Sequence, residues 1–235
     1  PRPVRSFGPA CATAFVLPDS PEVVRRTLRG ADRRLLLAGY TFTSDRVASV
    51  LVAAARRGVD VRVLVDDAPV GGLSTAEAEA LDRLSRAAIP VRVVGGERAP
   101  FDFHHPKYAV VDDTALVLTE NWKPGGVGGR DSRGWGVRVA DPALAADLAA
   151  LHRADATAPG ARNWSSARTG RTFEPVPAAN GSYPSRVGPS TLPAREVRVL
   201  TAPGNAGDAV VRLVDGAERR VDVLGPTLGS ADGPL

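Results

Sequence analysis

The sequence has little of several residue types, and each shortage excludes something. Cys11 is the only cysteine among the 235 residues, so no internal disulfide can form. Aromatic residues make up only 5% of the chain, and the basic residues are scattered singly or in pairs. This pattern disfavours a nucleic-acid surface of clustered basic and interleaved aromatic side chains. No apolar run reaches the roughly 18 residues of a membrane-spanning helix. None of these features assigns a cellular compartment.

Lysine and histidine are also scarce. Arginine supplies nearly all of the 30 basic residues, and the only lysines are Lys107 and Lys123. The only histidines are His104, His105 and His152. Lys107 therefore stands two places after His105 in a chain that otherwise uses arginine. Because an ammonium is a compact point charge and a guanidinium a wide planar fork, we infer that this position needs lysine for its chemistry.

The first 155 residues alternate between strand and helix patterns, and 43% of the chain is hydrophobic, enough for a sizeable core. This alternation predicts an α/β domain, with one mixed β-sheet flanked by helices on both faces. We expect strands at residues 12–17, 34–42, 59–65, 91–94, 108–111, 115–118 and 135–139. We expect helices at residues 21–30, 44–57, 74–88 and 142–154.

The rest of the chain changes character twice. Residues 156–194 are rich in Pro, Gly and Ser and lack periodicity, which predicts a linker between domains. Residues 195–235 resume the α/β pattern and repeat the start of the chain at a constant offset, so that Gly30-Ala31-Asp32-Arg33-Arg34 corresponds to Gly216-Ala217-Glu218-Arg219-Arg220. We therefore expect residues 1–155 to form a first domain and residues 195–235 to be the truncated start of a second repeat.

His105 and Lys107 share one face of the strand expected around residues 105–111, because side chains alternate along a strand. A three-residue hairpin loop at residues 112–114 would place Thr119 opposite Lys107 and Asn121 opposite His105. An imidazole, an ammonium, a hydroxyl and a carboxamide on one patch suit a phosphate group. His104 faces the other way and is expected to be structural, and no third ligand spacing supports a zinc site.

The run His105-x-Lys107-x4-Asp112 resembles the His-Lys-Asp signature of the phospholipase D superfamily. The resemblance covers roughly residues 12–155 and implies a phospholipase D-like mixed sheet. It also implies a reaction on phosphodiesters that needs no metal or cofactor. His105 would be the nucleophile or its acid partner, Lys107 would bind phosphate oxygens, and Asp112 would support the motif. Lys123 could reach the ligand from the glycine-rich loop that follows.

The resemblance implies a second motif whose histidine acts as general acid. The repeat stops before any such histidine, so we expect it to come from a missing C-terminal half or from a homodimer. On that expectation, residues 1–235 alone are inactive or nearly so.

One segment departs from the family pattern, which continues with Gly-Ser-x-Asn. Here the run is Leu118-Thr119-Glu120-Asn121-Trp122. With one residue deleted, Thr119 takes the serine place and Asn121 the asparagine place; without the deletion, Glu120 takes the serine place. We favour the deletion because it keeps Asn-Trp, and because a carboxylate would repel a phosphate unless it were protonated.

The leading functional hypothesis is a phosphodiester hydrolase of the phospholipase D type that forms a phosphohistidine on phospholipid substrates. The alternatives are a phosphatidyltransferase like cardiolipin synthase, which differs only in its acceptor, and a nuclease, which the scattered charge disfavours. A non-catalytic phosphate-binding module is the alternative from another functional class. An intact second His-x-Lys motif would favour an enzyme, and its absence would favour binding or a homodimeric site.

Overall fold

The structure is a computed structural model that describes residues 4–128, 132–165 and 184–223. Its centre is a mixed sheet in the order β10-β2-β8-β7-β6-β3-β4-β5-β9. The strands of this sheet are β2 (Ala10–Leu17), β3 (Arg34–Gly39), β4 (Asp60–Asp66), β5 (Val91–Val94), β6 (Tyr108–Val111), β7 (Thr114–Leu118), β8 (Gly134–Ala140), β9 (Ala161–Asn163) and β10 (Ser190–Ala194). Strands β3, β4 and β5 run parallel, and the other pairs are antiparallel.

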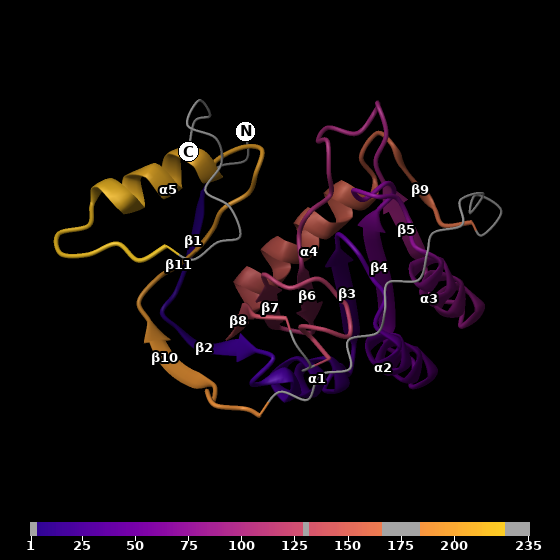
Figure 1. Cartoon of the computed structure of the whole chain (residues 1–235), viewed down its shortest axis with the longest axis horizontal. Coiled ribbons are helices and arrows are strands. Elements are labelled where there is room, and N and C mark those ends of the chain that lie inside the picture. Colours follow the sequence, from indigo (N-terminus) through magenta and orange to yellow (C-terminus); the bar gives the residue numbers. More distant parts are fainter. Residues whose placement is uncertain (1–3, 129–131, 166–183, 224–235) are drawn as a thin grey trace.

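Helices cover both faces of the sheet, as the strand and helix patterns predict (Figure 1). One face carries α1 (Pro21–Arg29), α2 (Asp45–Arg56) and α3 (Thr75–Arg86), and the other carries α4 (Pro142–Ala156). Each face has its own hydrophobic core: the first includes Leu28, Leu51 and Leu81, and the second includes Leu144 and Leu148. The α/β class and the sheet with two covered faces are thereby confirmed.

Local sequence signals explain where the helices begin. The Ser44 side chain accepts the Val47 N–H at the start of α2, and Ser74 accepts the Glu77 N–H at the start of α3. Asp141 accepts the Leu144 N–H at the start of α4, and proline occupies the first turn of α1 and of α4. These side chains satisfy backbone donors that have no partner inside the helix.

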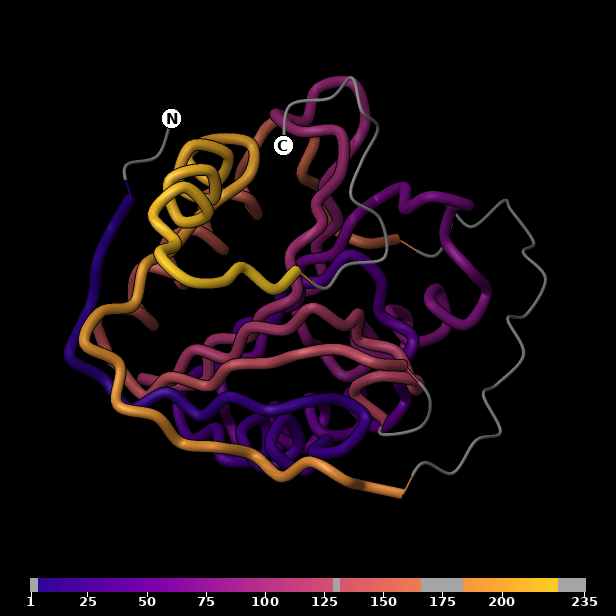
Figure 2. The backbone as a smooth tube through the Cα atoms, turned by 60° about the vertical axis from the view of Figure 1, so that its left-hand side comes forward, coloured from indigo at the N-terminus to yellow at the C-terminus, as the bar shows by residue number. Residues whose placement is uncertain are grey.

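The segment expected as a linker also contributes to the sheet. Strand β9 pairs with β5 at one edge, and β10 pairs with β2 at the other. The orange β10 runs alongside the indigo β2 in Figure 2, although the two are far apart in sequence. Covering both edges in this way leaves fewer unpaired strand groups. The proposed boundary at residue 156 remains a prediction.

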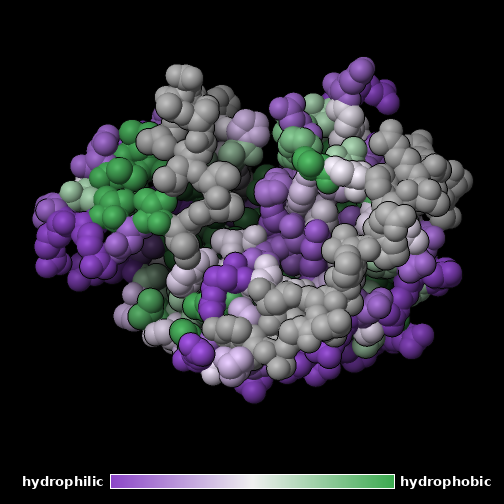
Figure 3. All heavy atoms as spheres, viewed as in Figure 1, coloured by the Kyte–Doolittle hydropathy of each residue, from purple (hydrophilic) through white to green (hydrophobic). Residues whose placement is uncertain are grey.

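A smaller unit lies beside the sheet and contains α5 (Ala206–Asp215) and a two-stranded sheet of β1 (Arg5–Phe7) and β11 (Val197–Val199) (Figure 1). Helix α5 has no buried residues, and its apolar side chains form the hydrophobic patch on this unit in Figure 3. By analogy with β3, which starts at Arg34, the repeat predicts a strand after Arg220. Residues 221–223 form no strand, and the later residues of the repeat lie outside the described part of the chain. The second repeat therefore stays a proposal. No helix in the described ranges is long and apolar enough to cross a membrane.

Candidate active site

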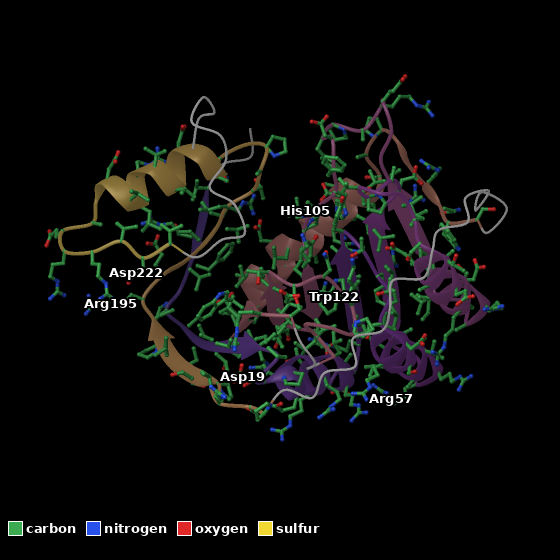
Figure 4. All side chains as sticks on the ribbon, viewed as in Figure 1. Asp19, Arg57, His105, Trp122, Arg195 and Asp222 are labelled. Carbon is green, nitrogen blue, oxygen red and sulfur yellow. The ribbon has the colours of Figure 1, made fainter. Side chains whose placement is uncertain are left out.

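The candidate site lies just before β6, because the strand expected around residues 105–111 begins only at Tyr108 and both His105 and Lys107 precede it. Asp66, the last residue of β4, fixes the backbone there by accepting the His104 N–H at 2.6 Å and the Ala68 N–H at 2.8 Å. Figure 4 places His105 and Trp122 in the same central region of the molecule. The motif is thus anchored from β4, which is separated from β6 by β3 in the sheet, before its own strand begins.

His105 and Lys107 are in direct contact. Lys107 Nζ lies 2.8 Å from His105 Nδ1 and 2.9 Å from the His105 carbonyl oxygen. The Tyr40 ring packs against the imidazole with its centroid 4.3 Å away, and Lys107 Nζ lies 5.4 Å from the Tyr40 centroid. His105 is exposed whereas Lys107 is only 7% exposed. The geometry therefore presents an accessible imidazole over a largely buried cation.

The surroundings shift the pKa of both groups downward. Burial lowers the pKa of His105, and the charge of Lys107 lowers it further, so the imidazole is neutral at pH 7. Burial also lowers the pKa of Lys107 to about 8, with Lys123 adding to the decrease and Glu120 opposing it. A neutral imidazole beside a mostly protonated amine is the charge state that a nucleophile next to an anion-binding group requires.

The hairpin between β6 and β7 differs from the one expected. Val111 pairs with Thr114, so the loop contains only Asp112 and Asp113, and the expected pairing of Val111 with Ala115 is wrong. The Leu118 N–H donates to the Lys107 carbonyl, so Lys107 lies opposite Leu118. This register shifts each later residue of β7 by one place and turns it to the other face of the sheet.

The shift removes Thr119 from the predicted phosphate patch. The Thr119 hydroxyl accepts the Trp135 N–H at 2.9 Å, so it points toward β8. Asn121 no longer lies opposite His105, and its Oδ1 is buried without a hydrogen-bond partner among the described residues. Trp122 is fully buried and donates from Nε1 to the Ala38 carbonyl at 2.8 Å, which anchors the loop that carries these residues.

Glu120 lies just beyond the last bonded pair of the hairpin, Lys107 with Leu118, and the two-residue loop agrees with the alignment without a deletion. The charge of Glu120 raises the pKa of Lys107 and so opposes the larger decrease caused by burial. Sequence reasoning set this residue aside because it favoured a deletion. Only the length of the hairpin loop, which the Asp112-Asp113-Thr114 sequence leaves open, could have revealed its position.

A second carboxyl group lies deeper in the site. Glu77 is 1% exposed and accepts the Phe42 N–H at 2.6 Å. Burial raises its pKa to about 7, and this increase exceeds the lowering caused by the Phe42 hydrogen bond and the Lys123 charge. Lys123 is exposed, and its charge acts on both Glu77 and Lys107. The run Ser74-Thr75-Ala76-Glu77 is typical of a capping box, and this is the only role that the sequence suggests for Glu77.

The structure does not bring Asp112 to this site. Asp112 lies five residues beyond Lys107 at the far end of β6, roughly 17 Å away at about 3.4 Å per residue. Its carboxylate accepts the N–H groups of Asp32, Arg33 and Arg34 at 2.9 Å each. Burial raises its pKa, but the three hydrogen bonds and the Arg33 charge outweigh this and lower it overall. Asp112 supports the motif by holding the turn before β3.

The other two histidines are buried. His104 is 2% exposed, with Nε2 3.5 Å from Asp155 Oδ2 on α4, which agrees with its expected structural role. His152 Nε2 lies 3.2 Å from the Leu37 carbonyl oxygen, and burial lowers its pKa to about 4. Neither side chain reaches the surface beside His105. In the parts of the chain that the structure describes, no group of three or more His, Cys, Asp or Glu side chains could hold a metal ion.

Residues 24–155 match the family model described as "Cardiolipin synthase, PLD-like domain". The match covers more than half of the chain and includes the His105–Lys107 pair. The chain belongs to the phospholipase D-like family. No curated protein sequence matches it.

Solved structures of this family share the fold. Nuc from Salmonella typhimurium is 21% identical with a TM-score of 0.56, and the alignment covers 69% of this chain and 99% of Nuc. NucT from Helicobacter pylori is 16% identical with a TM-score of 0.54, covering 67% of this chain and 99% of NucT. Phosphatidylserine synthase from Haemophilus influenzae is 14% identical with a TM-score of 0.50, covering 67% of this chain and 41% of that enzyme. At these identities the likeness shows the phospholipase D fold alone.

Proposed function

We propose that this phospholipase D-like protein cleaves phosphodiesters through a phosphohistidine at His105, with phospholipids as the substrate class. The observation that carries the proposal is the accessible, neutral imidazole in contact with the buried Lys107 ammonium. A fixed cation beside the nucleophile lowers the energy of the negative charge that develops on the phosphoryl oxygens. The compact lysine suits this contact, since it acts as a point charge.

The reaction proceeds in two displacements. A ring nitrogen of His105 attacks phosphorus, the P–N bond forms, and the P–O bond to the leaving alcohol breaks as that oxygen takes up a proton. Water then attacks the phosphohistidine, the P–N bond breaks, and the water proton passes to a base. Lys107 contacts the non-bridging oxygens in both steps, and Lys123 approaches them from the exposed loop.

The proposal predicts a covalent intermediate that depends on His105. Wild-type protein mixed with phosphatidylglycerol in detergent micelles should show the mass of a phosphatidyl adduct in intact-protein mass spectrometry. His105→Ala should form no adduct and lose turnover while keeping its unfolding temperature. Lys107→Arg should lose at least about tenfold in kcat/KM, because the wider head misplaces the charge.

Arg98→Ala provides the matched control, because Arg98 is an exposed cation on the nearby loop. It should leave turnover unchanged. Full turnover by His105→Ala would contradict the mechanism. Binding of the lipid without turnover or adduct would favour the non-catalytic phosphate-binding module, and cleavage of a single-stranded oligonucleotide in preference to lipid would favour a nuclease.

Phosphatidyl transfer is the second candidate, because the matched family model is that of a cardiolipin synthase domain. The same intermediate yields transfer when an alcohol replaces water. Reaction of phosphatidylglycerol in increasing ethanol should separate the two activities, because the transferred product, phosphatidylethanol, differs from the substrate. A rise in transferred product at constant total turnover identifies a transferase, whereas release of phosphatidic acid throughout identifies a hydrolase.

A further inference from the structure

Two exposed hydrophobic side chains lie beside the candidate site on separate loops. Phe103 is on the loop between β5 and β6, two residues before His105, and is 47% exposed. Val70 is on the loop between β4 and α3 and is 80% exposed. A hydrophobic residue exposed by itself is common on protein surfaces and needs no explanation. Two that converge on an accessible imidazole do need one.

Tyr40 connects both residues to the imidazole. The centroid of its buried ring lies 4.3 Å from that of His105 and 6.1 Å from that of Phe103, whose ring meets it edge-on at 90°. The Tyr40 hydroxyl accepts the Val70 N–H at 2.5 Å. These contacts gather Phe103 and Val70 around the same ring that packs against the proposed nucleophile.

Asp66 joins the two loops to each other. Its buried carboxylate accepts the Ala68 N–H, two residues before Val70, and the His104 N–H, one residue after Phe103. The position of one loop therefore fixes that of the other, and the two exposed side chains form a surface that is in place before a ligand arrives.

The Val70 side chain projects from a tight turn. The Gly72 N–H donates to the Pro69 carbonyl at 2.6 Å, and Gly71 adopts a φ of 86° inside the turn. Turn corners are usually occupied by Gly, Pro, Asn, Asp or Ser, so a valine is an unusual residue here. Because most of its side chain is exposed, Val70 adds little to the core, and its apolar surface is available to a ligand.

The polar and apolar parts of this region suit the two parts of one ligand. His105 and Lys107 suit a phosphate, and the apolar surface beside them suits a group attached to that phosphate. Removing apolar surface from water favours a hydrocarbon group at this place. A sugar or another polar group would gain nothing from contact with Phe103 and Val70.

We propose that Phe103 and Val70 bind the acyl part of the substrate and thereby determine a preference for lipids over phosphodiesters without acyl chains. This inference rests on the proposed function, and it deepens that function by naming the residues that recognise the hydrocarbon. With the lipid phosphate at His105 and Lys107, the acyl carbons nearest the glycerol cover Phe103 and Val70.

The test measures equilibrium binding to protein that carries His105→Ala, which keeps the ligand intact, by NMR chemical-shift titration. The ligands are dihexanoyl phosphatidylglycerol, kept below its critical micelle concentration, and glycerophosphoglycerol, which has the same phosphodiester without acyl chains. Phe103→Ser and Val70→Ser should each raise the Kd of the lipid about tenfold, because each removes an apolar contact. Neither should change the Kd of glycerophosphoglycerol by more than about twofold, because the phosphate contacts remain.

Two further variants serve as controls. Phe103→Leu keeps an apolar side chain but cannot stack on an aromatic ligand, so the Kd of the lipid should stay within about threefold of that of the parent protein. Leu192→Ser is the matched surface control, because Leu192 is 53% exposed on the edge strand β10, which β2, β8 and β7 separate from β6. It should leave both Kd values unchanged.

Equal weakening of both ligands, or no weakening of the lipid, would overturn this inference and leave the proposed function intact. An equal loss of lipid binding in Phe103→Leu and Phe103→Ser would overturn it in favour of an aromatic ligand. A loss seen only in cosedimentation with dioleoyl phosphatidylglycerol vesicles would overturn it in favour of a membrane anchor. A parent protein that binds neither ligand would contradict the proposed function and this inference together.

Discussion

At the scale of single residues, the site is a set of coupled charges. Lys107 is buried enough to lose part of its basicity, Glu120 restores some of it, and Lys123 opposes this effect. Burial lowers the pKa of His105, and the charge of the contacting Lys107 lowers it further. Each of these groups sets the ionisation of another, so a substitution at one should be detectable in the pH dependence of the others.

The first expectation concerns that pH dependence, measured as kcat/KM on bis(para-nitrophenyl) phosphate. In the proposed mechanism, turnover needs neutral His105 and protonated Lys107. Because the pKa of His105 is lowered, activity should persist below pH 6.5, the usual imidazole value. Because the pKa of Lys107 is about 8, activity should decline as the pH rises through that value.

Lys123→Ala provides a directional check on this assignment. Removing the Lys123 charge raises the pKa of Lys107, so the alkaline limb should move to higher pH. Arg98→Ala, which removes an exposed cation that has no influence on the Lys107 pKa, should leave the limb in place. An alkaline limb that stays fixed in Lys123→Ala would show that another group controls it.

At the scale of elements, the β6–β7 hairpin does two separate things. Its open end continues from the His105–Lys107 segment just before β6, and its closed end carries Asp112, which adopts a φ of 51° in the two-residue loop. The Asp112 carboxylate binds the backbone just before β3 and thereby joins the hairpin to the parallel half of the sheet. The motif therefore has the candidate reactive residues, His105 and Lys107, before β6 and a structural residue, Asp112, after it.

Asp112→Asn should therefore reduce stability without altering chemistry. Charged acceptors contribute about 1.5–3 kcal/mol per hydrogen bond, and asparagine keeps one carbonyl acceptor, so we expect a loss of about 1–3 kcal/mol in the free energy of unfolding. The pKa of Asp112 is lowered in the folded protein, so this difference is present above about pH 4 and disappears as the pH falls through the folded value.

Urea unfolding at pH 7 and pH 3 measures this difference. Asp113→Asn is the matched control, since Asp113 is the exposed neighbour that contacts only the Arg33 side chain in the contacts described. It should change stability by no more than about 0.5 kcal/mol. A large loss of turnover in folded Asp112→Asn would instead assign Asp112 a direct role in the reaction.

At the scale of the whole molecule, two similar helices have different surroundings. The offset that relates Gly30 to Gly216 also relates Leu28 of α1 to Val214 of α5. Leu28 is 1% exposed and packs in the core, whereas Val214 is 42% exposed. Figures 1 and 3 show α5 beside the sheet domain with its hydrophobic side chains uncovered on the viewed face.

Substitution at these corresponding positions should have unequal effects. Leu28→Ala should lower the free energy of unfolding by about 2–5 kcal/mol, because it removes buried atoms and leaves a cavity. Val214→Ala should change it by less than about 0.5 kcal/mol, because its side chain is exposed. Chemical denaturation followed by circular dichroism measures both. A comparable loss in Val214→Ala would show that α5 is covered in solution.

The sequence by itself determined the class of fold, the order of the elements from residue 12 to residue 155, and the placing of His105 and Lys107 next to a strand at residues 108–111. These follow from local rules: apolar periodicity, capping residues at positions 44, 74 and 141, and the alternation of side chains along a strand. Predicted and observed strands agree at residues 91–94 and 108–111. The boundaries of the helices agree within two residues.

Only the tertiary structure decided which residues meet at the site. A hairpin shorter by one residue turned Thr119 toward β8 and put Leu118 opposite Lys107, because register sets the face of every residue beyond the loop. Tyr40 and Asp66 reach the site from other strands, and no local pattern records such long-range contacts. The edge strands β9 and β10 were missed for the same reason: each is short, and each is defined by its partner rather than by its own periodicity.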